Sequence, residues 1–416
     1  MEKKLGNLFK GDKVIWMVFF FLCMISIVEV FSASSNLTYK SQNYMGPIIY
    51  HASTIIAGVV VAVITLNIPC RFFKLMTPFL LIVSALTLLW VLIGGESING
   101  ANRVISVAHF TFQPSEIAKG TMVLVTAQIL SAMQHENGAD RNAFKYILIV
   151  LLPMAFVIGI ENLSTAALLC GVIFFMMFIG RVPISQLGRL MGGVAIFVAL
   201  FLTLVLTLGK VEEKRAESTQ MTEVVSESGE VKADKDALKG GGVFHRFATW
   251  RNRILKHIGN EEVAPEKFDI DKDMQIAHAN IAIVKSNVIG KGPGNSDERD
   301  YLPQAFSDFI FAIIIEEMGL IGAAVVVFLY IVLLYRAARI ASRCENNFPA
   351  FLIMGLSLLL VVQAVFNMMV AVGLAPVTGQ PLPLISKGGT STIINCAYIG
   401  AILSVSRSAK MKTNKI

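Results

Sequence analysis

The chain has 416 residues, of which 55% are hydrophobic and only 16% are charged, and its mean hydropathy is +0.65. Soluble globular domains carry about 25% charged residues, so this composition excludes an ordinary soluble protein. It predicts an all-α, polytopic membrane protein. The formal net charge of +7 belongs to loops between membrane spans and gives no reason to expect nucleic acid as a partner.

Apolar runs close to the roughly 20 residues needed to cross a bilayer recur along the chain and predict about ten transmembrane helices. We expect the helices at residues 14–34, 47–68, 75–94, 114–133, 144–160, 164–180, 188–208, 309–335, 349–373 and 391–406. The first run lacks a small-residue cleavage site and is followed by many others, so we expect an anchor and not a signal peptide.

Lysine and arginine are concentrated in the short loops on one side of these spans. The residues on that side are Lys3, Lys4, Lys10, Lys13, Arg71, Lys74, Arg141, Lys145, Arg181, Arg189, Arg336, Arg339, Arg343, Arg407, Lys410, Lys412 and Lys415. The short loops of the other side carry only Lys40, Arg103 and Lys387. Because positive charge stays in the cytoplasm, both termini are predicted to be cytoplasmic. The whole chain, 1–416, is then a single transmembrane domain with one large extracytoplasmic loop, 209–308.

The large loop changes character along its length. Residues 210–242 are charged, rich in serine and nearly free of aromatic residues, which is typical of a disordered insertion. In 243–308 we expect short amphipathic helices followed by the candidate catalytic segment. Phe244, Phe247, Trp250, Ile254 and Leu255 recur at helical intervals among arginines. That helix either lies on the membrane surface or docks on the protein, and the two alternatives are compatible. A second helix is expected from about Met274 to Val288.

A second extracytoplasmic loop, 376–389, is unusually apolar and contains three prolines and three glycines. The prolines exclude a helix through it. Irregular backbone at membrane depth is tolerated only where protein buries it or where it lines a cavity. We therefore expect this loop to line a cavity.

Asp308 is the first candidate for chemistry, because it stands where the large loop re-enters an apolar run beginning at Phe309. A carboxylate at such a boundary is costly unless it is solvated or paired, so it marks a functional site by default. The alternative is that Asp308 caps the following helix, with Ser307 sharing that role. The two roles can coexist.

Other charged residues also fall inside predicted spans. Glu116 and Lys119 are three residues apart and can pair on one helix face, which indicates either a polar cavity or a structural ion pair. Glu316 and Glu317 lie roughly 12 Å deeper than Asp308 along the same helix. That is too far for a two-carboxylate pair of the glycosidase kind, which needs about 5–10 Å, so we expect a packing or cavity role.

Some polar residues have simpler interpretations. Glu161 and Asn162 are expected to cap the sixth span. The five cysteines and His109, His245, His257 and His278 form no metal-ligand spacing. We therefore predict no metal site and treat the histidines as surface or packing residues.

Three blocks of sequence together resemble motifs of the SEDS family of ten-span membrane glycosyltransferases. The blocks are Gly100-Ala101-Asn102-Arg103 with Gln113-Pro114-Ser115-Glu116 and Lys119; Gly294-Asn295-Ser296 with Tyr301-Leu302-Pro303, Ser307-Asp308 and Glu316-Glu317; and Asn367 with Gly373 to Gly379, Pro381-Leu382-Pro383, Ser386 and Gly388-Gly389. The tripeptide 294–296 favours the cell-division branch over the elongation branch.

The chain departs from the family pattern beside Asp308. Where the family commonly has Pro-Glu-Ala-His-Thr-Asp, this chain has Pro-Gln-Ala-Phe-Ser-Asp at 303–308. The carboxylate is kept and the imidazole is lost, so we expect no histidine relay. Asn102 and Val104 replace the usual Arg and Trp, and Lys387 stands where Tyr is usual.

The resemblance implies a glycosyltransferase that polymerises lipid II, with Asp308 activating the acceptor hydroxyl. The implied substrate-binding residues are Arg103, Glu116, Lys119, Lys291, Asn295, Ser296, Ser307 and Lys387, among which the cations would surround the diphosphate. No cofactor is certain, although Mg²⁺ or Mn²⁺ could serve. The implied partners are a class B penicillin-binding protein, whose membrane helix would pack on the eighth or ninth span, and other division proteins. The implied location is the septal inner membrane.

Two alternatives use the same residues differently. The chain could be a lipid II flippase or a non-catalytic division scaffold. A transporter often shows internal repeats and midplane helix breaks, whereas this chain has no internal repeat and its polar motifs cluster on the extracytoplasmic side. A scaffold gives no reason for Asp308. The enzyme is therefore favoured.

Overall fold

The computed structural model describes residues 10–34, 46–98, 101–107, 110–136, 138–200, 202–203, 274–302 and 305–413. The chain divides into two compact units, Ser185–Phe268 and the combination of Met1–Ile184 with Asp269–Ile416. The larger unit holds the features described below, except the helix Ile184–Leu200, which belongs almost wholly to the smaller unit. The predicted insertion at 210–242 and the amphipathic helix after Val243 lie outside the described residues.

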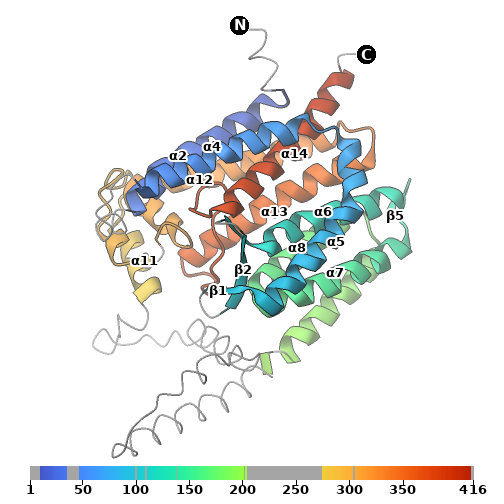
Figure 1. Ribbon diagram of the computed structural model, residues 1–416, viewed down its shortest axis with the longest axis horizontal. Coiled ribbons are helices and arrows are strands. Elements are labelled where there is room, and N and C mark those ends of the chain that lie inside the picture. Colours follow the sequence, from blue (N-terminus) through green and yellow to red (C-terminus); the bar gives the residue numbers. More distant parts are fainter. Residues whose placement is uncertain are drawn as a thin grey trace, which may run out of the picture. The chain divides into compact units, whose positions relative to one another are not determined.

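The larger unit is a bundle of helices (Figure 1). Its helices are α2 (Lys13–Ala33), α4 (Gly46–Asn67), α5 (Cys70–Gly94), α6 (Pro114–Ala132), α7 (Arg141–Glu161), α8 (Leu163–Ile179), α11 (Met274–Lys285), α12 (Ile310–Ala341), α13 (Asn347–Ala371) and α14 (Thr390–Thr413). Helix α13 packs against α6, α8, α12 and α14, so it provides a common wall for helices that are distant in sequence.

The predicted all-α membrane architecture is confirmed. Within the described residues, six helices are long and apolar enough to cross a membrane, namely α2, most of α4, α5, α7, α12 and α13. Helices α8 and Ile184–Leu200 are apolar but shorter. Helices α6 and α14 coincide with predicted spans but carry more polar residues, many of which are buried in the bundle. The predicted helix from Met274 is α11, which ends at Lys285.

Two small sheets occupy connections that the sequence pattern did not predict as strands. Strands β1 (Glu96–Ile98), β2 (Ala101–Val107) and β3 (Phe110–Phe112) form an antiparallel sheet in that order. Strands β4 (Gln134–His135) and β5 (Gly138–Ala139) form a second pair. The first sheet contacts the start of α14, where Thr390 Oγ1 donates to the Thr111 carbonyl at 3.0 Å.

Helix α12 is broken at Gly319, whose φ of 69° and ψ of −172° are not helical. Residues 287–292 fill the break. The amides of Leu320 and Ile321 donate to Asn287 O at 3.4 Å and Val288 O at 3.2 Å. The carbonyls of Glu316 and Glu317, which these amides would bond in a regular helix, accept instead from Lys291 N at 3.0 Å and Gly292 N at 2.8 Å. The break therefore leaves no backbone group of these pairs unsatisfied, as the membrane interior demands.

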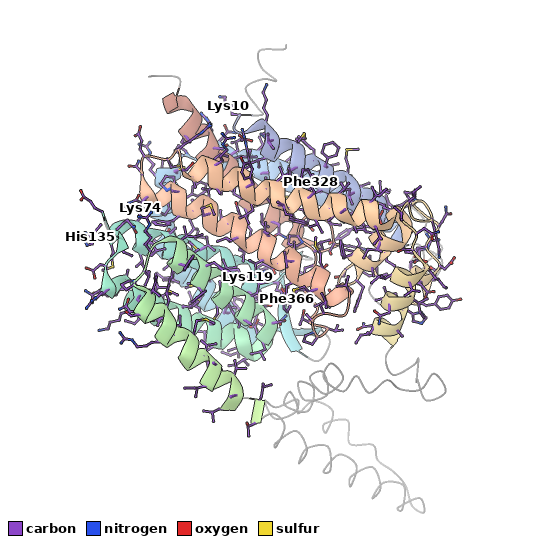
Figure 2. All side chains as sticks on the ribbon, turned by 180° about the vertical axis from the view of Figure 1, so that it is seen from behind. Lys10, Lys74, Lys119, His135, Phe328 and Phe366 are labelled. Carbon is purple, nitrogen blue, oxygen red and sulfur yellow. The ribbon has the colours of Figure 1, made fainter. Side chains whose placement is uncertain are left out.

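Basic residues gather at one end of the larger unit. Asp12, the N-cap of α2, accepts from Arg336 at 2.8 Å, and Arg407 donates to Asn67 at 3.4 Å. Figure 2 shows Lys10 and Lys74 near this end, away from the side that carries Phe366. This grouping is the one expected from the positive-inside rule. Which face is cytoplasmic stays a prediction.

Candidate active site

Asp308 lies in a short turn immediately before α12 and is half-buried. Helix α12 has Phe309 at its N-cap position, with no side-chain capping bond there. The hydroxyl of Ser307 donates to Asp308 Oδ1 at 3.1 Å. Phe309, and not Asp308, thus occupies the N-cap position, and the predicted role of Asp308 in chemistry stays a prediction.

The backbone under Asp308 is held at three successive carbonyls. Phe306 O accepts from the amide of Lys387 at 2.9 Å. Ser307 O accepts from the hydroxyl of Ser386 at 2.6 Å, and Asp308 O accepts from Asn367 Nδ2 at 2.8 Å. Three bonds to consecutive residues leave this turn little freedom, which is the pre-organisation that a catalytic group needs.

Two of these donors belong to residues 380–387, which we call the strap. The strap is irregular and largely buried, as predicted for the loop 376–389. Leu384 within it has a φ of 68°, a left-handed conformation that costs a side-chain-bearing residue about 1–3 kcal/mol and persists only where its surroundings enforce it. The cavity that this loop was expected to line stays a prediction.

Neutral side chains from three helices bond the outward carbonyls of the strap. Asn367 Nδ2 donates to Gln380 O at 2.7 Å, and Gln363 Nε2 donates to Pro381 O at 3.1 Å. The hydroxyl of Tyr330 donates to Pro383 O. The hydroxyl of Ser26 donates to Ile385 O at 2.6 Å. These bonds give buried irregular backbone the partners that it cannot find in lipid.

Ser26 is itself held by a buried histidine. Its hydroxyl has a single proton, which is committed to Ile385 O, so the 2.9 Å contact with His51 Nε2 is a bond that the imidazole donates. Helices α2 and α4 are thereby tied to the strap.

The predicted Glu116–Lys119 pair is confirmed, with 2.9 Å between Lys119 Nζ and Glu116 Oε1. Figure 2 shows Lys119 among the helices, and its side chain is 0% exposed. Lys119 also donates to Gln363 Oε1 at 2.7 Å, while Tyr398 donates to Glu116 O at 2.5 Å. In this arrangement Lys119 is neutralised and enclosed. Its predicted contact with substrate stays a prediction.

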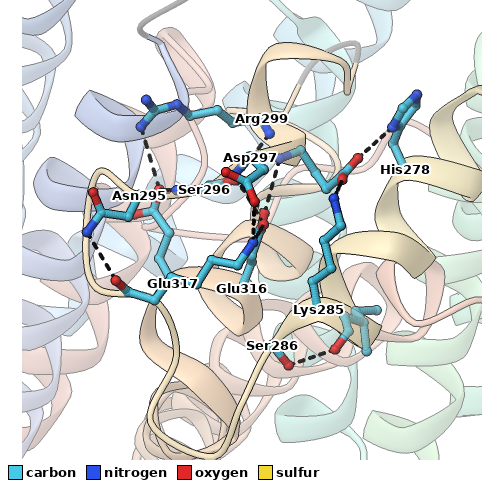
Figure 3. A network of polar contacts seen from close by, with 12 residues as sticks. His278, Lys285, Ser286, Asn295, Ser296, Asp297, Arg299, Glu316 and Glu317 are labelled. Carbon is cyan, nitrogen blue, oxygen red and sulfur yellow. Dashed lines mark hydrogen bonds and ion pairs between the residues drawn. The ribbon is translucent and has the colours of Figure 1, made fainter.

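The glycine-rich loop, residues 290–299, wraps around the carboxylates of Glu316 and Glu317 (Figure 3). Glu317 accepts from the amides of Gly294 at 2.9 Å and Ser296 at 3.3 Å, and from the hydroxyl of Ser32. Arg299 lies 3.9 Å from the same carboxylate. Backbone N–H groups gathered in this way form an anion-binding concavity, which here is filled by the side chain of Glu317.

Glu316 accepts further hydrogen bonds from the glycine-rich loop. It accepts from Lys291 Nζ at 2.7 Å, from the hydroxyl of Ser296 at 2.5 Å and from the amide of Asp297 at 3.1 Å. Bonds from Lys291 to Asp297 and to Glu316 raise the pKa of Lys291, and the same Lys291–Asp297 bond lowers the pKa of Asp297. We expected a packing or cavity role for the two glutamates. The structure shows instead that they anchor the glycine-rich loop.

This arrangement bears on three predicted substrate contacts. Lys291, Asn295 and Ser296 lie together, but each serves the glycine-rich loop. Lys291 pairs with two carboxylates, Ser296 bonds Glu316, and Asn295 Nδ2 donates to Lys291 O at 3.0 Å. Their amides and charges are engaged internally, so their predicted binding of substrate stays a prediction.

Glu298 connects the glycine-rich loop to α11. It bonds His278 Nδ1 at 2.6 Å and Lys285 Nζ at 2.5 Å. Burial raises the pKa of Glu298, but the bonds from Lys285 and His278 outweigh it and the net pKa is lowered. His278 also stacks on Tyr301 at 5.5 Å between ring centroids, so of the two roles expected for the histidines, surface or packing, His278 has the packing role. The other three lie outside the described residues.

Lys387 differs from the other candidate cations. Its ammonium lies 4.9 Å from the centroid of the Phe306 ring, a cation–π distance, and its backbone amide bonds the Asp308 turn. Among the described residues no carboxylate pairs with it. Burial lowers the pKa of Lys387. Arg103 lies in β2, with its side chain outside what the structure describes.

Several residues at this site were not singled out as site residues from the sequence. They are Ser26, His51, Tyr330, Gln363, Gln380 and Ser386. One signal was present, because Gln363 and Asn367 stand four residues apart in an otherwise apolar span and therefore share one helix face. Of the two residues predicted to cap the sixth span, Asn162 is confirmed as the N-cap of α8, with its side chain accepting from Thr165 N. Glu161 is instead the last residue of α7. Within the described part of the chain no group of three or more His, Cys, Asp or Glu could hold a metal ion.

The fold and the site define a polytopic helical membrane protein with an organised carboxylate at one helix start. Residues 12–411 match the family described as cell cycle protein, whose model is named for FtsW, RodA and SpoVE. The chain belongs to this family, the SEDS family.

Curated relatives cover nearly the whole chain. A probable peptidoglycan glycosyltransferase FtsW of Buchnera aphidicola is 27% identical, over 99% of this chain and 97% of its own. That of Hahella chejuensis is 30% identical over 93% and 88%, and the peptidoglycan glycosyltransferase MrdB of Escherichia coli K12 is 26% identical over 97% and 96%.

Solved structures share the fold. A chain from a structure described as "Structural coordination of polymerization and crosslinking by a peptidoglycan synthase complex" has a TM-score of 0.69 and 22% identity, over 96% of this chain and 98% of its own. The rod shape determining protein RodA of Thermus thermophilus has a TM-score of 0.62 and 20% identity, over 97% and 98%.

Proposed function

We propose that this protein is a peptidoglycan glycosyltransferase that polymerises lipid II into glycan strands. Membership of the SEDS family and relatives named as peptidoglycan glycosyltransferases support the activity. The observation that supports the assignment of Asp308 is the triple hold on Phe306, Ser307 and Asp308, because it fixes the turn that bears the carboxylate, as a positioned catalytic group requires.

The chemistry requires one base. The acceptor sugar hydroxyl attacks the anomeric carbon of the donor, its proton passes to the carboxylate of Asp308, and the bond from that carbon to the polyprenyl diphosphate breaks. The diphosphate leaves as a stable anion, so no second carboxylate is needed to protonate it, in contrast to a glycosidase. The hydrogen bond from Ser307 orients the carboxylate.

The departing diphosphate needs positive charge. We propose Lys387 as its principal cation, because Lys387 is joined through its amide to the Asp308 turn and has no carboxylate partner among the described residues. Arg103 is a second proposed contact. A divalent cation such as Mg²⁺ or Mn²⁺ would take most of its ligands from diphosphate and water, since the described residues contain no cluster of metal ligands.

We further propose that the protein works in the septal inner membrane of a bacterium, with both termini cytoplasmic. A class B penicillin-binding protein is the proposed partner, its membrane helix packing on α12 or α13, the eighth and ninth predicted spans. The similar fold found in a peptidoglycan synthase complex, which couples polymerization to crosslinking, supports such a partner. FtsW and MrdB relatives occur at similar identity, so the division role rests on Gly294-Asn295-Ser296.

The test is polymerisation of labelled lipid II by the full-length protein purified with its cognate penicillin-binding protein. We expect glycan ladders from the wild type and none from Asp308→Asn. Asp140→Asn is the matched control, because Asp140 caps α7 through a bond from Asn142 N and asparagine caps equally well. Ladders from Asp308→Asn would remove Asp308 from the chemistry.

If the intact wild-type complex gives no ladders, the polymerase assignment fails. A lipid II flipping assay in vesicles would then test the transporter hypothesis. Recovery of the assembled division complex without either activity would support the scaffold hypothesis.

A further inference from the structure

Gln363 and Asn367 form two rungs of amide groups on one face of α13. Both are 1% exposed and lie four residues apart, hence one above the other on the helix. Asn367 donates its two side-chain N–H groups to the carbonyls of Asp308 and Gln380. Gln363 lies between the ammonium of Lys119 and the carbonyl of Pro381.

The orientation of the Gln363 amide follows from its neighbours. An ammonium only donates hydrogen bonds, so the atom facing Lys119 at 2.7 Å is Oε1. The atom facing Pro381 O at 3.1 Å is then Nε2. Both contacts are satisfied by one orientation, and reversing the amide would break both.

A continuous chain of bonds therefore runs from α6 to Asp308. The Glu116–Lys119 pair holds Gln363, Gln363 holds the strap at Pro381, and the strap holds the turn through Ser386 and Lys387. The first links are buried and the later ones are partly buried, and buried polar networks of this kind are costly to leave partly satisfied.

We propose that Gln363 is a positioning residue of the reaction, which couples the Glu116–Lys119 ion pair to the strap and so fixes the Asp308 turn. This proposal rests on the proposed glycosyltransferase activity. Gln363 touches no reacting atom. Its contribution is to keep the strap against the turn despite the left-handed backbone at Leu384.

Two substitutions of Gln363 distinguish its coupling of Lys119 to the strap from a role limited to accepting a hydrogen bond from Lys119. Gln363→Met keeps the length of the side chain and removes both hydrogen bonds. Gln363→Glu keeps an acceptor for Lys119 but offers no N–H to Pro381 O. If Gln363 acts through the strap, both variants lower kcat about 10- to 100-fold, because small misplacements of a catalytic group have effects of that size, while KM for lipid II changes little.

The matched control is Ser357→Ala on the same helix. Ser357 is 0% exposed, and its hydroxyl has no hydrogen-bond partner among the described residues, so its loss should leave kcat unchanged. Tyr330→Phe offers a milder perturbation of the strap from α12, since it removes only the bond to Pro383 O. We expect it to lower kcat in the same direction and by less.

Backbone amide exchange gives a readout that does not depend on activity. The amide of Lys387 is bonded to Phe306 O, and its exchange should accelerate in Gln363→Met and Gln363→Glu but not in Ser357→Ala. Full activity in Gln363→Glu, or lost activity with unchanged exchange at Lys387, would overturn the proposal. If the wild type itself makes no glycan, the proposed function fails, and the exchange rates alone still decide whether Gln363 holds the strap.

Discussion

The glycine-rich loop and the strap are both irregular segments beside membrane helices, yet they are held by opposite chemistries. The glycine-rich loop turns N–H groups inward, and two carboxylates, Glu316 and Glu317, accept them. The strap turns carbonyls outward, and neutral donors on α2, α12 and α13 bond them. Whether a segment presents N–H groups or carbonyls thus decides which side chains can anchor it.

The difference also explains where charge is tolerated. Each carboxylate of the glycine-rich loop faces several donors, and Lys291 or Arg299 lies nearby, so burial of the charge is compensated. The side chains of α2, α12 and α13 face carbonyl oxygens of the strap, so a carboxylate in place of one of these donors would meet an acceptor. The two regions should therefore respond oppositely to exchange of an amide for an acid.

The largest effect is expected at the contact between the glycine-rich loop and the break in α12. A Cβ added at Gly319 would overlap Gly290 N and Val288 O, at a φ of 69°. We expect Gly319→Ala to destabilise the protein by about 4 kcal/mol or more, measured as thermal unfolding in detergent. Gly171→Ala, where an added Cβ meets no atom within 4 Å, should instead raise stability by about 0.5–1 kcal/mol. Equal behaviour of the two variants would contradict the close approach.

Placing a charge against the strap tests the comparison directly. Asn367→Asp puts carboxylate oxygens against Asp308 O and Gln380 O, which both require a donor. We expect a loss of about 2–3 kcal/mol in the free energy of unfolding, with polymerisation lost as well. Asn367→Leu removes the same bonds without adding charge and should cost less. A greater stability of Asn367→Asp than of Asn367→Leu would contradict this explanation.

Removing a charge from the glycine-rich loop is the converse change. Glu317→Gln turns an N–H donor toward Gly294 N or Ser296 N, each of which already donates. The expected cost is about 2 kcal/mol, read from urea or thermal unfolding. Amide exchange at Gly294 should accelerate in this variant, while exchange at Lys387 in the strap should not. Acceleration at both sites would show that the two regions are not independently anchored.

A smaller effect is expected where only neutral bonds are lost. Ser26→Ala removes the donor to Ile385 O and the acceptor for the His51 imidazole, and we expect destabilisation of about 1–1.5 kcal/mol. Ser26→Thr keeps the hydroxyl and should restore most of the stability. No rescue by threonine would indicate that the size of the side chain, and not its hydrogen bond, matters at this position.

The smallest effect concerns pH. Because the folded-state pKa of Glu298 lies below its ordinary value of 4.5, its contribution to stability is complete above pH 4.5. The contribution is lost as the pH falls through the lower folded-state value. The melting temperature measured between pH 6 and pH 3 should fall less steeply in Glu298→Gln than in the wild type. Parallel curves would remove Glu298 as a source of acid sensitivity.

Local patterns allowed part of this structure to be predicted. The membrane helices follow from apolar runs, since each run is long enough to span a bilayer by itself. The Glu116–Lys119 pair follows from a three-residue spacing on one helix, and the cap at Asn162 follows from its place at a tight turn. The sequence also predicted α11, although the helix ends at Lys285 and not at Val288 as expected.

The rest depended on residues that are far apart in the sequence. The three-stranded sheet at 96–112 and the break at Gly319 are stabilised by pairing partners that no local pattern reveals. Glu316 and Glu317 were recognised as unusual, but the loop that they hold, 290–299, comes well before them in the chain. Only folding shows which N–H groups of that loop turn inward.

By itself, the sequence determined that this is a polytopic helical membrane protein of the SEDS type with one prominent carboxylate, Asp308. Those properties reside in hydrophobicity and in short motifs, which act within a few residues. Only the tertiary structure decided how Asp308 is held, because the bonds from Ser26, Tyr330, Gln363 and Asn367 join segments separated by up to 359 residues. Buried backbone must find a partner wherever the fold brings one, and that choice is made by packing.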